Sequence, residues 1–129
     1  MGKINTTIHP DKDGITHINM YSKARTPFGK MLSDFYHYPI TTPEGKFESV
    51  EAYWYYLSLP ESVNRDKIRK CYGWLAKKTG RDLRKEAGEE NLIFDPNFEN
   101  KILTAIEQKV RENIDLLLPE YKDLPIIII

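Results

Sequence analysis

Residues 49–56 read Ser-Val-Glu-Ala-Tyr-Trp-Tyr-Tyr, the densest aromatic stretch of the chain, and they surround one acidic residue, Glu51. Ser49 is a good helix N-cap and Pro60 is a stop signal, so we predict a helix over residues 50–59. Apolar side chains cover nearly the whole circumference of this helix, which is typical of a buried one. A buried carboxylate is costly unless it is paired or has a chemical function. Glu51 is therefore the first candidate for a functional residue.

The composition is that of an ordinary globular protein of 129 residues, long enough for one domain with its own core. Its 19 basic and 19 acidic residues cancel, so we expect neither sequence-specific nucleic-acid binding nor membrane attachment. No apolar run approaches the roughly 20 residues of a membrane span, and no signal peptide opens the sequence. Cys71 is the lone cysteine, which excludes an internal disulfide and is expected to be a small core residue. These features predict a cytosolic protein.

The predicted elements are short strands and longer helices. Strands are expected over 15–21, 37–42 and 46–48, the last two joined by a turn at 43–45, and helices over 50–59, 63–79 and 96–118. Gly80 is expected to end the second helix. Residues 1–14 should form a loose segment or a hairpin, and 124–129 an apolar tail that would make a buried strand. Its end in four isoleucines resembles a truncated or edited terminus, or one covered by other elements. We therefore predict a mainly helical α+β fold in a single compact domain spanning residues 1–129, with a small β-hairpin or short sheet.

Two further segments carry candidate binding residues. The stretch from Lys23 to Lys30 is predicted as a loop with three cations, which would suit a phosphate, although an ordinary solvated loop fits the composition equally well. In the last predicted helix, Lys109 and Asn113 lie on or beside the apolar face. A lysine there usually extends to the surface, but the alternative is an inward-facing functional pair.

Metal and cofactor chemistry find little support in the sequence. His9, His17 and His37 stand far apart, without the spacing of a metal site. The glycine patterns of phosphate loops and dinucleotide-binding folds are absent. We expect no cofactor.

Several short motifs follow one another along the chain. They are Tyr21-Ser22, Leu32-Ser33-Asp34-Phe35, Lys46-Phe47-Glu48-Ser49-Val50-Glu51, Gly80-Arg81 and Lys109-Val110-Arg111-Glu112-Asn113. In content and order they resemble the NADAR (YbiA-like) domain family over most of residues 21–118. The resemblance implies a compact, mainly helical domain that hydrolyses N-glycosidic bonds. Substrates in that family include phosphorylated ribosylamino-pyrimidine intermediates and ADP-ribose attached to guanine bases.

The resemblance also implies roles for individual residues. Glu51 would be the acidic active-site residue, Lys109 would match the second family lysine, and Arg81 would lie near a phosphate-bearing ligand. Tyr21, Ser22, Phe35 and Asn113 fall within the matching motifs and are candidate substrate-binding residues, as is Lys23 directly after them.

The chemistry of the residues points the same way. Cleavage of a ribosyl C–N bond passes through an oxocarbenium-like state that a carboxylate stabilises, and a carboxylate also activates water. Asp34 is a candidate second carboxylate for positioning water or a ribose hydroxyl. Burial among Trp54 and Tyr55 would raise the pKa of Glu51, and these aromatic rings could stack on a base. The alternative is a structural Glu51 that accepts hydrogen bonds from Tyr21 or a backbone amide.

The chain differs from the family pattern within the central helix. Ala52 stands where the family has a histidine, Tyr55 where it has a glutamine, and Ser58 where it has a lysine. Two functions therefore stay open. One is a hydrolase acting on an ADP-ribose-like or ribosyl-phosphate molecule or an ADP-ribosylated nucleobase. The other is an inactive module that binds a nucleotide or a protein partner.

Overall fold

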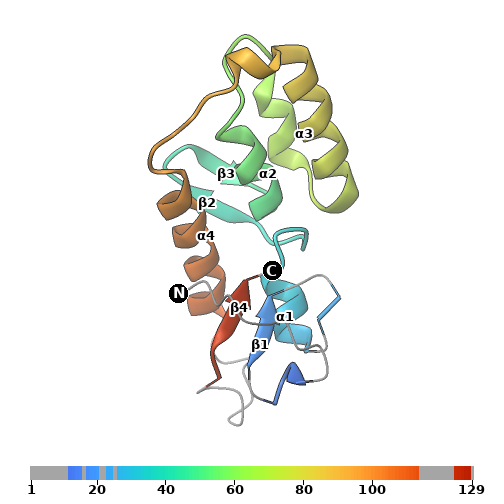
Figure 1. Ribbon diagram of the computed structural model, residues 1–129, viewed down its shortest axis with the longest axis vertical. Coiled ribbons are helices and arrows are strands. Elements are labelled where there is room, and N and C mark those ends of the chain that lie inside the picture. Colours follow the sequence, from blue (N-terminus) through green and yellow to red (C-terminus); the bar gives the residue numbers. More distant parts are fainter. Residues whose placement is uncertain (1–11, 16, 21–22, 25, 114–123, 129) are drawn as a thin grey trace.

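Short strands and longer helices alternate along the chain in the computed structural model, which describes residues 12–15, 17–20, 23–24, 26–113 and 124–128. The elements are β1 (Ile18–Met20), α1 (Pro27–Leu32), β2 (Ile40–Thr42), β3 (Gly45–Phe47), α2 (Val50–Tyr56), the 3-10 helix η2 (Arg65–Lys70), α3 (Gly73–Ala87), the 3-10 helix η3 (Glu89–Asn91), α4 (Phe98–Glu112) and β4 (Ile126–Ile128) (Figure 1). The predicted class, a mainly helical α+β fold, is confirmed.

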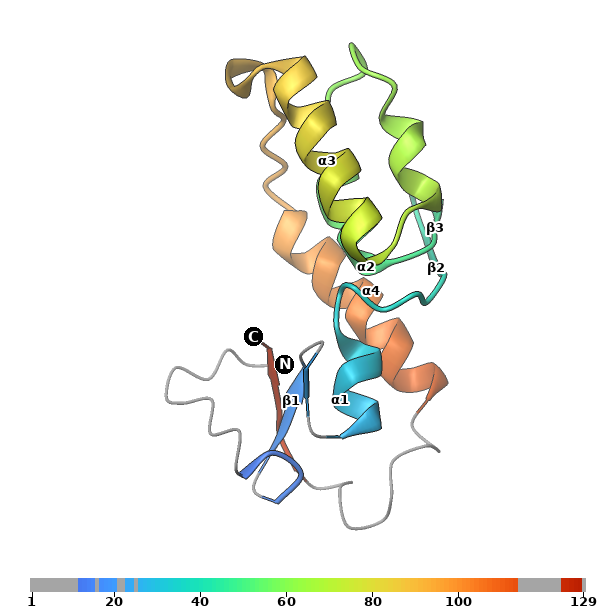
Figure 2. The ribbon, with the colours of Figure 1, turned by 90° about the vertical axis from the view of Figure 1, so that its right-hand side faces the viewer.

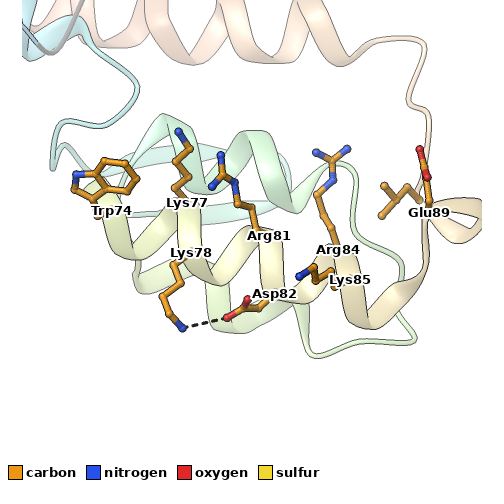
Figure 3. A pocket seen from close by; sticks show the side chains of 9 residues that line it. Trp74, Lys77, Lys78, Arg81, Asp82, Arg84, Lys85 and Glu89 are labelled. Carbon is orange, nitrogen blue, oxygen red and sulfur yellow. Dashed lines mark hydrogen bonds and ion pairs between the residues drawn. The ribbon is translucent and has the colours of Figure 1, made fainter.

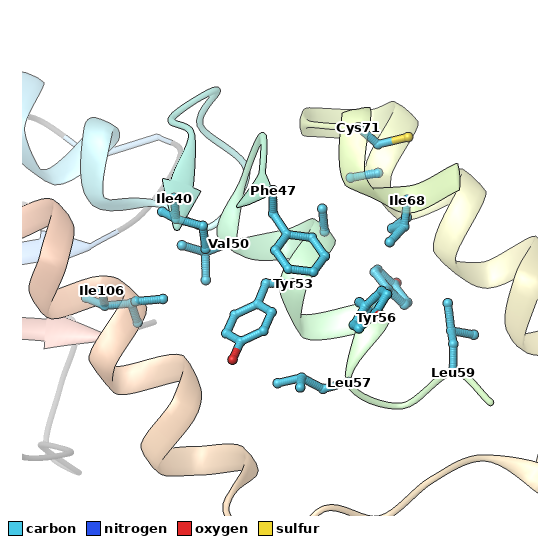
Figure 4. Packing of buried hydrophobic residues seen from close by; sticks show 14 of the residues in the cluster. Ile40, Phe47, Val50, Tyr53, Tyr56, Leu57, Leu59, Ile68, Cys71 and Ile106 are labelled. Carbon is cyan, nitrogen blue, oxygen red and sulfur yellow. The ribbon is translucent and has the colours of Figure 1, made fainter. Parts of the chain in front are cut away.

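Helix α2 occupies the centre of the fold and contacts η2, α3 and α4 around it (Figures 1 and 2). Ser49 caps it by accepting a hydrogen bond from the Ala52 amide at 3.1 Å, as predicted. Val50 and Tyr53 are at most 1% exposed and pack with Phe47 and Ile106 in the core (Figure 4). The prediction of a buried helix is therefore confirmed.

The predicted C-terminal end of α2 is wrong by three residues. The helix ends at Tyr56, and residues 57–59 form a turn. Ser58 explains this end, because its hydroxyl donates to the Tyr55 carbonyl at 2.8 Å and its amide donates to the same carbonyl at 3.0 Å. Such local side-chain bonds to the backbone compete with helix continuation.

The predicted hairpin is confirmed, with a first strand shorter than expected. β2 and β3 pair in antiparallel register, with Ile40 opposite Phe47 and Thr42 opposite Gly45. Gly45 has φ +115°, a conformation that favours glycine, and the Thr42 hydroxyl donates to its carbonyl at 2.8 Å. The hairpin thus directs the chain into the Ser49 cap of α2.

The first and last strands form a second, parallel pair. Ile18 lies opposite Ile126 and Met20 opposite Ile128, so the apolar tail does form a strand. Between β1 and α2, the predicted loop over 23–30 is wrong in part, because residues 27–32 form α1. Thr26 caps this helix by accepting from the Gly29 amide at 2.9 Å, and Pro27 occupies its first turn.

The second predicted helix, over 63–79, is also wrong. Residues 65–70 form the short 3-10 helix η2, the chain is extended at Cys71, and α3 begins at Gly73, which has φ +58°. Gly80 does not end a helix but lies buried in the middle of α3, and Gly88 ends it instead. Cys71 is 5% exposed and packs in the core, as expected.

Helix α4 crosses the molecule from the side of α3 to the side of α1 (Figure 2). Its described part ends near Asn113, inside the predicted range of 96–118, whose last residues lie outside the described part of the chain. Asp95 accepts from the Asn97 amide at 2.8 Å, so it shapes the turn before α4 although Asn97 is the capping residue. None of the described helices is long and apolar enough to cross a membrane.

Candidate functional site

Two carboxylates lie together where α1 and α2 approach each other. Glu51 is in the first turn of α2, and its amide donates to the Asp34 carbonyl at 3.0 Å. Among the described residues neither carboxylate receives a hydrogen bond that would mark a purely structural role, and Asp34 Oδ1 is buried without one. The two side chains are close enough for the charge of Asp34 to act on Glu51.

The surroundings of the two carboxylates shift the pKa of each and place different charges beside them. Burial, and to a smaller extent the charge of Asp34, raise the pKa of Glu51 from near 4.5 to about 7, against the opposing charges of Lys77 and Arg81. Burial also raises the pKa of Asp34, but the Lys109 ammonium opposes this shift. Near neutral pH, Glu51 is therefore about half protonated, while Asp34 has a cation beside it that favours its ionised form.

Lys109 enters this site from α4. Its side chain is 0% exposed, and its Nζ donates to the Ser33 carbonyl at 2.9 Å. Burial lowers the pKa of Lys109 to about 8, although the charge of Asp34 acts in the opposite direction. The inward orientation considered from the sequence is confirmed, and the lysine does not extend to the surface.

A row of three cations lies on α3, and two of them, Lys77 and Arg81, are close enough to Glu51 for their charges to act on it. Lys77, Arg81 and Arg84 extend from the same side of the helix, whereas Lys78 and Asp82 form an ion pair on another side (Figure 3). The row lines a pocket of about 890 Å³. Among the described residues none of the three cations has an ion-pair partner, and Arg84 Nε is buried without a hydrogen bond. This arrangement suits an anionic ligand.

Aromatic rings border the row at both of its ends. At one end Phe35 and Trp74 meet edge to face, with ring centroids 6.1 Å apart, and the Lys77 Nζ lies 5.1 Å from the Trp74 centroid. At the other end the Arg84 guanidinium lies 5.4 Å from the centroid of the Trp54 ring. Cation–π contacts of this kind hold the cations in place without neutralising them.

The structure brings together Asp34, Glu51, Arg81 and Lys109 of the predicted residues, with Phe35 and Trp54 at their borders. Tyr55 instead packs between α2 and α3, with 5% of its surface exposed. Asn113 donates to the Tyr38 hydroxyl and to the Lys109 carbonyl, both at 2.8 Å, so it supports the end of α4. Lys23 is exposed and makes no contact with the carboxylates among the described residues. Tyr21, Ser22 and Arg25 lie outside the described residues.

Three residues of this site were not predicted: Trp74, Lys77 and Arg84. The signal was present, because positions 74, 77, 81 and 84 follow one another at steps of three and four, the spacing of one helix face. Treating Gly80 as a helix end divided this face in two.

Comparison of the chain with family models, with curated proteins and with solved structures finds no match. The site must therefore be interpreted from its own geometry. Among the described residues no group of three histidine, cysteine or acidic side chains could hold a metal ion. What the geometry offers is proton transfer from a buried carboxyl group, a second carboxylate and cations for an anionic ligand.

Proposed function

We propose that this protein hydrolyses the N-glycosidic bond between a phosphorylated ribose and a nitrogen base, in an ADP-ribosylated base or a phosphorylated ribosylamino nucleotide. The observation that carries the proposal is that Glu51 is close enough to Asp34, Lys77 and Arg81 for their charges to act on it, while Lys77 and Arg81 line a pocket together with Arg84. The same function is what the resemblance to NADAR domains implies, and a NADAR-like fold is part of the proposal.

The charges of the site fit a phosphorylated ligand. Four cations, from Lys77, Arg81, Arg84 and Lys109, stand against two carboxylates, and Glu51 is about half protonated near pH 7. The net positive charge matches one or two phosphate groups. Arginine suits them better than lysine alone, because its planar fork binds phosphate oxygens in pairs.

The carboxylates have distinct roles in the proposed reaction. Protonated Glu51 donates its proton to the leaving nitrogen as the C1′–N bond breaks, and ionised Asp34 stabilises the positive charge that develops on the ribose. Water then attacks C1′, its oxygen forms the new C–O bond, and its proton passes to a carboxylate. The charge of Lys109 favours this ionised form of Asp34, against the burial that raises the pKa of Asp34.

The proposal is tested by incubating the protein with ADP-ribosylated guanosine and with nucleoside 5′-phosphates, and by measuring the released base by chromatography. Glu51→Gln should lower the rate about 10²- to 10⁴-fold, the usual contribution of a general acid. Glu61→Gln is the matched control, because the Glu61 side chain is 88% exposed and remote from the site. The wild-type rate should fall as pH rises through about 7, because Glu51 then loses its proton.

A thermal-shift titration with ADP-ribose separates the remaining outcomes. A ligand at a hundred times its Kd stabilises the fold by about 2.7 kcal/mol. A melting shift that Arg81→Ala abolishes, without any hydrolysis, would favour the inactive binding module. The serine at position 58, where the family has a lysine, also favours that alternative. The absence of both hydrolysis and shift would overturn the proposal.

A further inference from the structure

We propose that Trp74 and Phe35 form the subsite for a planar heteroaromatic leaving group, so that the substrate lies along α3 with its ring at the N-terminal end of that helix and its phosphates toward the C-terminal end. This inference rests on the proposed function and adds the orientation of the substrate, the chemical class of the leaving group and the residue that recognises it.

Trp74 presents a ring that is both exposed and held in place. It is 72% exposed and lines the pocket, although large aromatic side chains are usually buried. Its edge-to-face contact with Phe35 and the Lys77 ammonium near its ring fix its position. Lys77 Nζ lies 5.9 and 5.1 Å from the Phe35 and Trp74 ring centroids, and its charge acts on Glu51, which links the aromatic pair to this carboxylate. A planar ring that leaves from C1′ would meet this surface.

The residues follow α3 in the same order as the groups of a ribosyl nucleotide. Figure 3 shows Trp74, Lys77, Arg81 and Arg84 in succession along the helix. At 1.5 Å per residue they cover ~15 Å, enough for a ring, a ribose and its phosphates. Glu51 is electrostatically coupled to Lys77 and Arg81, so the bond to be broken lies between the aromatic end and Arg84. The ring then lies on Trp74 and the phosphates lie near Arg81 and Arg84.

The opposite orientation is less favourable because the other tryptophan is covered. The Trp54 ring makes edge contacts with Tyr55 and Phe98, at centroid distances of 4.9 and 5.9 Å, and Arg84 lies over it. A cation lies near each tryptophan ring, but Trp54 is half-buried whereas Trp74 is 72% exposed, so Trp74 offers more open ring surface for stacking.

The test measures the Kd of two probes, AMP and ribose 5-phosphate, which differ in the presence of the heteroaromatic ring. The Glu51→Gln protein is used so that the probes are not turned over. Base–aromatic stacking predicts that AMP binds about tenfold more tightly or better. Adding Trp74→Ala should remove this preference and leave the Kd of ribose 5-phosphate unchanged, whereas Trp74→Phe should retain most of it. Leu75→Ala is the matched control, because Leu75 is the next residue, is 60% exposed and does not line the pocket.

A fluorescence measurement provides the second readout. In a Trp54→Phe protein the signal comes from Trp74 alone. AMP should quench it with the same Kd as in the binding experiment, and ribose 5-phosphate should not. Equal binding of the two probes, with no effect of Trp74→Ala, would overturn this inference. Hydrolysis that depends on Glu51 would in that case still support the proposed function. Failure of both probes to bind would also overturn this inference, and together with the absence of hydrolysis and of a melting shift with ADP-ribose it would overturn the proposed function.

Discussion

At the scale of single residues, Glu51 shows how packing can raise the pKa of a carboxyl group. Its carboxylate lies in the first turn of the central helix, a position that favours negative charge, yet its pKa is raised to about 7. Burial and the neighbouring Asp34 outweigh the helix dipole and the two cations of α3. An ionised Glu51 therefore destabilises the fold, which is the expected signature of a carboxylate kept for function.

Glu51 should make stability depend on pH in a defined direction. The folded protein keeps the Glu51 proton up to about pH 7, whereas the unfolded chain releases it near 4.5. The free energy of unfolding should therefore decrease as pH rises through this window, by about 1–2 kcal/mol after allowance for the solvent contact of the carboxylate. Glu51→Gln should remove this decrease and be the more stable protein at pH 8. Urea unfolding from pH 4.5 to 8 measures this.

The control for this prediction is Glu61→Gln, which changes an exposed carboxylate and should follow the wild type at every pH. A Glu51→Gln protein that is less stable than wild type at pH 8 would show that ionised Glu51 is a structural partner rather than a strained acid.

At the scale of elements, the contact between α2 and α3 depends on one glycine. A Cβ atom added to Gly80 would lie 2.3 Å from Cγ of the Tyr55 ring, far inside contact distance. The absence of this side chain lets α3 approach α2 closely enough for Lys77 and Arg81 to act on Glu51. Gly80 thus has a packing role in the middle of a helix, where glycine is otherwise unfavourable.

Gly80→Ala should destabilise the protein even though alanine favours helices by about 1 kcal/mol over glycine. The clash with Tyr55 forces α2 and α3 apart, and overpacking of this kind costs about 1–3 kcal/mol. Thermal or denaturant unfolding would show it. In a Tyr55→Ala background the same substitution should lose its penalty and become neutral or stabilising, because the ring is gone. An equal penalty in both backgrounds would contradict the packing role.

At the scale of the whole molecule, sequence patterns predicted the central helix α2 and the hairpin before it better than the boundary between η2 and α3. The all-round apolar pattern of α2, its Ser49 cap and the hairpin turn at Gly45 are local signals, and the structure confirms them. The division between η2 and α3 was missed because apolar spacing continues across Cys71, while the role of Gly80 depends on a ring from another helix. Glu51 and Lys109 were candidates from their chemistry, but their common site with Lys77 and Arg84 depends on how α3 and α4 are placed.

One polar network joins three separate parts of the chain. Lys101 of α4 donates to Glu44 in the hairpin turn at 2.9 Å and to Asp95 at 2.6 Å, and Glu44 also accepts from the Tyr53 hydroxyl of α2 at 2.7 Å. Burial opposes ionisation of Glu44, but the bonds from Tyr53 and Lys101 hold its pKa below the usual value. The bond from Lys101 likewise lowers the pKa of Asp95. The network fixes the position of α4, which carries Lys109 into the site.

Lys101→Met should therefore lower the melting temperature at pH 7, because it leaves two half-buried carboxylates without their cation. The loss should diminish as pH falls below the ordinary pKa values of 4.5 and 3.8. In the wild type the lowered pKa values stabilise the fold above those pH values, and this contribution disappears in acid. Scanning calorimetry from pH 7 to 3 measures the difference. Lys78→Met is the matched control, because its ion pair with Asp82 is exposed and should contribute little. A deficit that stays constant with pH would show that Lys101 stabilises the fold through packing of its aliphatic stem and not through its charge.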